Sequence, residues 1–285
     1  MSRVASAKYD ANANPMAPRV AAINPMGRPA IGRAFHHRLT GLIVPVSLLA
    51  LWEVLARAGI VPPNWLPAPS AIVQTIRDLA NSGDLSQHIG KTLGRVIAGF
   101  LIGAAAGTIL GSLTGCSKIL RKLLDPTLQS LRNIPSMAWV PLFLLWLGIG
   151  ETSKVSLIAL GAFFPVYLNL TAGIRSVDAK LVEVGEVFGL RGPALVRRVV
   201  FPAALPSYMV GLRSGLGLAW MFVVAAEIMG ASRGVGFLMI DGQQTGRADI
   251  IIAAVLLFAI FGKLSDLGLE VLGRRLLRHQ KVYGE

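Results

Sequence analysis

The chain has 285 residues, of which 53% are hydrophobic and 15% are charged, and its mean hydropathy is +0.60. Soluble domains carry about 25% charged residues, so this composition excludes an ordinary soluble protein and indicates an integral membrane protein. The formal net charge is +13, but the sequence lacks the basic stripe on a soluble face that a nucleic-acid-binding domain requires.

Residues 1–38 are rich in Ala, Pro, Asn and Arg, and Asp10 is their only acid. The stretch has no continuous apolar core, so it is not a secretory signal peptide. We expect a disordered basic tail in the cytoplasm. An Arg-rich, acid-poor beginning also fits an organellar transit peptide, which stays an alternative.

Six apolar stretches each approach the ~20 residues that a helix needs to cross the hydrocarbon core. The third is interrupted by Pro135 and Pro141, so we expect part of it to be kinked or non-helical, which is tolerated only inside protein or beside a water cavity. The predicted spans are 39–58, 93–115, 128–147, 155–174, 206–230 and 250–272.

Lys and Arg are spread unevenly over the segments outside these spans. If the N-terminus is cytoplasmic, eighteen of them fall on the cytoplasmic side and six on the opposite side. Basic residues mark cytoplasmic loops, so this bias predicts that both termini and the loop 181–206 are cytoplasmic. Most of the net charge is thereby explained by topology.

The second span carries a glycine at every fourth position, which places these residues on one helix face. Such a ladder lets a neighbouring helix approach closely. Plain helix packing within the subunit is the favoured reading, and a sliding interface in a moving bundle is the alternative. The ladder consists of Gly99, Gly103, Gly107, Gly111 and Gly115.

The loop 181–206 holds five charged residues and cannot lie in lipid. Its apolar residues recur at roughly helical spacing, and Gly189, Gly192 and Pro193 interrupt that pattern once. The pattern predicts two short amphipathic helices joined by a turn at a membrane face. Such an element suits docking by a cytoplasmic partner.

This loop resembles the EAA loop of ABC-importer permeases, in which a Glu-Ala-Ala triplet precedes a Gly and then an apolar-x-Leu-Pro group. The corresponding residues here are Glu183-Val184-Gly185, then Gly189, then Val199-Val200-Phe201-Pro202. Val184 and Gly185 replace the two alanines, and Phe201 replaces the Leu. The flanks 131–154 and 211–239 resemble the permeases for aliphatic sulfonates, taurine and nitrate, most of all the aliphatic sulfonate permeases. The resemblance covers roughly 40–278.

The resemblance implies an all-α, six-helix membrane bundle, the transmembrane domain of a type I ABC importer, over 39–278. It implies a coupling loop at 175–205 and a short C-terminal tail at 279–285. The residues that would contact the ATPase are Glu183, Val184, Gly185, Glu186, Gly189 and Pro202.

The same resemblance implies the assembly and the substrate. The partners would be a second copy of the chain, two ATP-binding subunits, a periplasmic or lipid-anchored binding protein, and the lipid of a bacterial inner membrane. The substrate would be a small anion, an aliphatic sulfonate before taurine or nitrate. ATP and Mg would be bound by the ATPase, because this chain has no phosphate-binding loop: Gly90-Lys91-Thr92 lacks the required Gly, and Leu85 stands there.

Polar and aromatic residues at membrane depth are candidates for the translocation path. Arg213 could attract an anion or lie at the lipid headgroups, and Glu227 could serve a gate or a binding-protein contact or be a plain polar residue at a helix end. Lys263, Asp266 and Glu270 share a helix face, where an ion-pair network is favoured over the proton relay that a gradient-driven secondary transporter would use. The path candidates are Asn133, Ser136, Trp139, Arg213, Trp220 and Glu227.

The single cysteine, Cys116, allows no intramolecular disulfide. The sequence also shows no ligand spacing typical of a metal site. We therefore expect no metal in this chain, and the family resemblance implies that the permease does no covalent chemistry.

Overall fold

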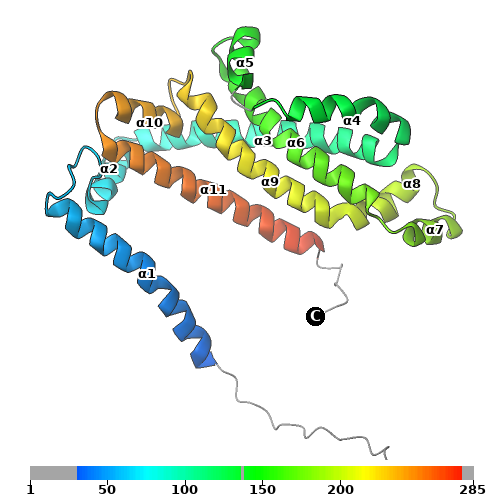
Figure 1. The fold of residues 1–285 in the computed structure, drawn as a ribbon, viewed down its shortest axis with the longest axis horizontal. Coiled ribbons are helices and arrows are strands. Elements are labelled where there is room, and N and C mark those ends of the chain that lie inside the picture. Colours follow the sequence, from blue (N-terminus) through cyan, green and yellow to red (C-terminus); the bar gives the residue numbers. More distant parts are fainter. Residues whose placement is uncertain (1–30, 136–137, 278–285) are drawn as a thin grey trace, which may run out of the picture. The chain divides into compact units, whose positions relative to one another are not determined.

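The computed structural model describes residues 31–135 and 138–277, with side chains from residue 43 onward, and every regular element in these ranges is a helix (Figure 1). The chain divides after Ala50 into two units. The first unit contains most of α1 (Ile31–Arg57), which covers the predicted first span. This helix begins inside the predicted tail 1–38, so residues 31–38 are helical and not irregular. The second unit carries the other helices.

Four helices in the described ranges are long and apolar enough to cross a membrane. They are α3 (Asp84–Cys116), α6 (Glu151–Arg175), α9 (Phe201–Ile228), which continues α8 (Pro193–Leu195) and the π-helix η2 (Val196–Val200), and α11 (Ala248–Leu276). The predicted second, fourth, fifth and sixth spans are confirmed as helices, each of which begins some residues earlier than the apolar stretch. The residues before each apolar stretch extend these helices beyond the hydrocarbon-length segment.

Helix α6 packs between α3 and α9 in the second unit (Figure 1). It runs parallel to α3, since Gly99 lies against Ile158 and Gly115 against Ile174. It runs antiparallel to α9, since Gly161 faces Phe222. Consequently the ends of α3 and α6 and the start of α9 lie at one end of the bundle. These helix directions agree with the alternating span directions that the charge bias predicts.

The glycine ladder makes the contact between α3 and α6. A Cβ at Gly99 would lie 2.6 Å from Ile158, one at Gly107 would lie 2.8 Å from the carbonyl oxygen of Phe163, and one at Gly103 would overlap the carbonyl oxygen of Ala159. The two backbones therefore approach to a distance that only glycine permits. The favoured reading, packing within the subunit, is the one that this contact supports.

The predicted third span, 128–147, is not one helix. The structure has α4 (Lys118–Arg132) and α5 (Trp139–Leu147), separated by a break after Arg132. Pro135 explains the break, because its ring excludes helical geometry for the residue before it and removes a backbone donor. Pro141 is accommodated in the first turn of α5, where its missing N–H costs nothing. The Tyr167 hydroxyl donates to the Asp125 carboxylate and ties α4 to α6.

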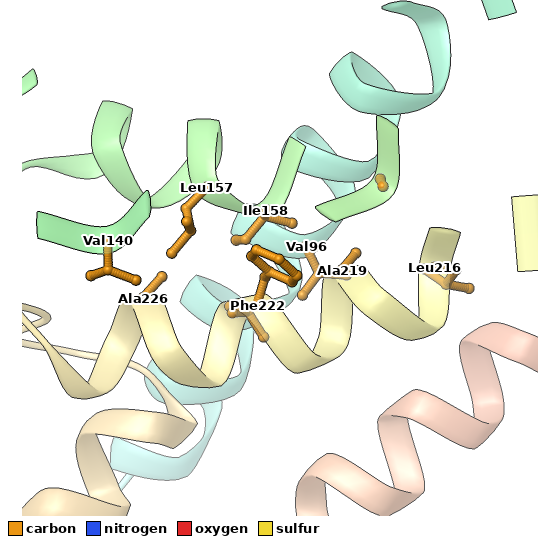
Figure 2. Packing of buried hydrophobic residues seen from close by; sticks show 10 residues of the cluster. Val96, Val140, Leu157, Ile158, Leu216, Ala219, Phe222 and Ala226 are labelled. Carbon is orange, nitrogen blue, oxygen red and sulfur yellow. The ribbon is translucent and has the colours of Figure 1, made fainter. Parts of the chain in front are cut away.

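The core consists of three apolar clusters. The central one joins α3, α5, α6 and α9, and Figure 2 shows Leu157, Ile158 and Phe222 interlocked at its centre. A second joins α2 (Pro69–Asn81), α3, α10 (Val235–Gln244) and α11, and a third joins α6 to η2 and α9. The outer faces of α3 and α11 remain apolar and exposed, as expected for surfaces against lipid.

Candidate functional site

A cavity of about 430 Å³ lies where α4 ends, against α6 and α9. Of the predicted path residues, Asn133 and Trp139 line it. Ser136 lies outside the described residues. The rest of the wall is mostly apolar and comes from the break after α4 and from facing sides of α6 and α9. These other lining residues are Arg132, Ile134, Pro135, Leu160, Gly161, Phe164, Pro165, Leu168, Leu218, Met221 and Phe222.

Arg213 does not line this cavity. Its Nε and Nη2 each donate to an Asp266 carboxylate oxygen at 2.8 Å, and Nη2 also reaches Glu270 at 3.3 Å. Lys263 lies 3.6 Å from the same Asp266 carboxylate. The positive charge of Arg213 is thus balanced by α11, so the expectation that it attracts the anion is not supported by its position. The favoured ion-pair network on α11 is present, and it includes Arg213.

Trp220 also lies outside the cavity. Its indole Nε1 donates to the Ser265 hydroxyl at 2.8 Å, and its ring packs edge-on against Phe258 at 6.1 Å. A buried tryptophan needs such a polar partner for its N–H. Trp220 therefore joins α9 to α11, a contact that fits a packing role.

Glu227 is fully buried, with 1% of its surface exposed. Its carboxylate accepts hydrogen bonds from Arg95 at 2.7 Å, from Thr92 at 2.8 Å and from the backbone N–H of Gly236 at 2.8 Å. Arg95 also donates to Glu151 at 2.6 Å. Glu227, in the last turn of α9, is therefore the centre of a polar cluster that joins four helices.

The sequence analysis missed Arg95 as the partner of Glu227. The available signal was the i, i+3 spacing of Thr92 and Arg95, which places both on one face of α3. Gly234, directly before α10, was a second signal, because glycine is favoured where another group approaches the backbone closely. In the structure, a Cβ at Gly234 would lie 2.5 Å from the Glu227 carboxylate. A buried carboxylate needs this many donors to offset its lost hydration.

The predicted coupling loop forms two short helical segments, as expected. Helix α7 (Ala179–Val187) is followed by a turn and by α8 and η2. Val187 and Phe188 are 86% and 79% exposed, and Glu183 and Glu186 are exposed beside them. The result is an apolar patch flanked by carboxylates at the end of the bundle where α3 and α6 terminate. An exposed patch of this kind marks an interaction surface.

Three residues of the predicted motif hold the loop in shape. Gly185 is buried under Leu195, whose Cδ1 would lie 2.6 Å from an added Cβ. Gly189 has a φ of 78°, in the left-handed region that favours glycine, and ends α7. Pro202 lies in the first turn of α9, directly after the wide turn of η2. The five-residue π-turn accommodates Pro202, which provides no N–H to the preceding turn.

Comparison with known proteins identifies the family. The family model described as "Binding-protein-dependent transport system inner membrane component" matches residues 99–278. An aliphatic sulfonates transport permease, SsuC of Bacillus subtilis, is 43% identical over 252 residues, 88% of this chain and 91% of that protein. The taurine transport permease TauC of Escherichia coli is 34% identical over 234 residues, 80% of this chain and 85% of that protein.

A solved structure shows the same fold. The MetNI methionine ABC transporter in an inward-facing conformation aligns with a TM-score of 0.60 at 18% identity, covering 66% of this chain and 94% of that chain. The chain belongs to the family of binding-protein-dependent transport system inner membrane components. It is an integral membrane permease of the ABC-importer class, and the resemblance drawn from the loop 181–206 is confirmed.

Proposed function

We propose that this permease carries small anions across a bacterial inner membrane, with aliphatic sulfonates as its substrate class. The support is the 43% identity with a permease named for these substrates. Taurine or nitrate import by the same mechanism, and gradient-driven secondary transport, are the competing outcomes of the uptake experiment below.

We infer that transport is driven by ATP hydrolysis on partner subunits, which would bind ATP and Mg. The observation that carries this inference is the exposed apolar and acidic surface of α7, centred on Val187 and Phe188. An ATP-binding subunit docked there would push on α7, and η2 would pass the motion directly into α9, with which it is continuous. The predicted contacts Glu183, Val184 and Glu186 are exposed on this surface.

The proposed assembly contains two copies of the chain, two ATP-binding subunits and a periplasmic or lipid-anchored binding protein. One chain supplies only one set of spans, so a central path would form between two copies. The termini and α7 would face the cytoplasm, because the basic residues concentrate at that end. The permease domain would extend over 39–278, with the coupling loop at 175–205.

Uptake tests the substrate class. A strain that lacks the gene should lose growth on an alkanesulfonate as its sole sulfur source and regain it with the gene. If the strain instead loses growth only on taurine, taurine import is supported. If it loses growth only on nitrate, nitrate import is supported. Uptake that persists without ATP but collapses with the proton gradient would support a secondary transporter.

Docking is tested at Gly189. Gly189→Trp should reduce recovery of the ATP-binding subunit with the tagged permease and abolish substrate-stimulated ATPase activity, while the chain stays in the membrane. Gly246→Trp is the matched control, because Gly246 has a similar φ of 67° and equally free surroundings but lies before α11, at the opposite end of that helix from the coupling loop. Equal recovery for both variants would count against docking on α7.

A further inference from the structure

The cavity at the end of α4 lies beside the middle of α6. Its α6 wall extends from Leu160 to Leu168, about 14 Å to about 26 Å along a helix about 38 Å long. If α6 spans a hydrocarbon core about 30 Å thick, this wall would lie away from both headgroup layers. Arg132, in the last turn of α4, lines the cavity at this depth. A cation there is costly unless it is paired or faces a polar path.

Arg132 differs from two other arginines of the bundle. Arg95 is paired with Glu151 and Glu227, and Arg213 with Asp266 and Glu270. Within the described residues, the Arg132 side chain makes no ion pair and no hydrogen bond with another residue. Arg132 is exposed and lines the cavity, so its guanidinium would be available to an anion there. Asn133, the next residue and also in the lining, provides an amide donor beside it.

The rest of the cavity suits a hydrocarbon chain. Phe164, Leu168, Met221 and Phe222 form apolar walls from α6 and α9, and the volume of about 430 Å³ is typical of a small-molecule site. None of the described lining residues is acidic, so the ammonium group of taurine would be desolvated without a partner. Nitrate has no apolar part that these walls could bury. The chemistry is that of an anionic head with an apolar tail.

We propose that this cavity binds unbranched alkanesulfonates during transport, with the sulfonate on Arg132 and Asn133 and the alkyl chain against Phe164, Leu168 and Met221. The inference deepens the proposed import function and rests on it. It assigns to Arg132 the attraction of the anion that the sequence predicted for Arg213. It also predicts discrimination within the permease itself between alkanesulfonates, taurine and nitrate.

Binding to the full-length chain in lipid nanodiscs tests the site directly. The probes are radiolabelled pentanesulfonate, with butane- and hexanesulfonate, taurine and nitrate as competitors. We expect affinity to rise about three- to four-fold with each added methylene, because each buries apolar surface. Taurine and nitrate should compete at least about 10-fold more weakly than pentanesulfonate, because the first leaves a buried charge unpaired and the second lacks a tail.

Variants separate the site from the fold. Arg132→Gln should weaken pentanesulfonate binding about 10-fold or more, since a hydrogen bond to a charged group is lost. Arg132→Lys should restore part of that loss, and it keeps the test open if the Gln variant does not fold. Arg121→Gln, which removes an arginine from the same helix outside the cavity, should bind as the wild type does. Wild-type binding by Arg132→Gln, no binding by the wild type, or equal affinity for all five anions would overturn the proposal.

Cellular uptake distinguishes the failure of this site from the failure of the proposed function. If the wild-type chain imports alkanesulfonates and Arg132→Gln imports them at the same rate, the site is wrong and the import function stands. If the wild-type chain imports no anion, the proposed function itself is wrong. Slower sulfonate uptake by Arg132→Gln, with normal uptake by Arg121→Gln, supports both.

Discussion

The buried cluster around Glu227 should be one of the most sensitive points of the permease. Replacing Glu227 with Gln keeps the shape of the side chain but removes the charge that balances Arg95. Breaking a buried ion pair by removing one partner costs about 3–5 kcal/mol. Arg95 keeps Glu151 and the Arg233 carbonyl as partners, so the lower end of that range, about 3 kcal/mol, is expected.

Glu151 provides the matched comparison. It also binds Arg95, at 2.6 Å, but its side chain is 58% exposed. Water reaches Glu151 and the position that it would vacate, and Arg95 keeps its bond to Glu227, so Glu151→Gln should cost less than about 1 kcal/mol. The same Arg95 guanidinium thus loses one carboxylate in each variant, at a buried position for Glu227 and at an exposed one for Glu151.

Thermal unfolding of the purified permease in nanodiscs measures the difference. At about 2–4 °C per kcal/mol, Glu227→Gln should lower the midpoint by roughly 6–12 °C and Glu151→Gln by less than roughly 4 °C. All variants need the same heating rate, because unfolding of a membrane protein can be irreversible. Equal midpoints for the two variants, or a wild-type midpoint for Glu227→Gln, would refute the buried-pair reasoning.

Three further predictions follow from packing and topology. Gly103→Leu should force α3 away from α6 and destabilise the folded chain by about 3 kcal/mol or more. Size-exclusion chromatography should then show a loss of monodisperse protein, and a normal elution profile would contradict the close contact. Gly185→Ala should be tolerated, because the tip of Leu195 can move, whereas Gly185→Leu should lower substrate-stimulated ATPase activity; equal activity would exclude a tight contact there. Reporter fusions at Gln280 and within 233–247 should lie in opposite compartments, and the same compartment for both would disprove the proposed topology.

The sequence alone was sufficient for the helices whose signal is local. Long apolar stretches identify α3, α6, α9 and α11, because hydrocarbon tolerates no unpaired backbone and makes a helix the only local solution. The coupling loop was also readable, since its helical spacing and its Gly and Pro interruptions are properties of neighbouring residues. The interruption of the third span was expected from Pro135 and Pro141, but the hydropathy pattern did not show that α4 begins as early as Lys118 and ends at Arg132.

The candidate site was only partly readable, because a side chain's partners come from distant segments. Asn133 and Trp139 line the cavity as predicted, since they flank a break that the prolines announce. The roles of Arg213 and Glu227 were decided by α11 and α3, which lie far away in sequence. Their charges alone could not show whether each side chain pairs with a residue of the protein or contacts the transported substrate.

Composition and charge distribution by themselves determined that this chain spans a membrane, and the pattern of the loop 181–206 determined the family, because both are encoded in local hydropathy and spacing. Only the tertiary structure decided which of Arg95, Arg132 and Arg213 are paired with carboxylates. Arg95 and Arg213 are neutralised by carboxylates brought next to them by helix packing, whereas Arg132 faces a cavity. That difference depends on which helices meet, and the free energy of burying a charge depends on its surroundings in three dimensions.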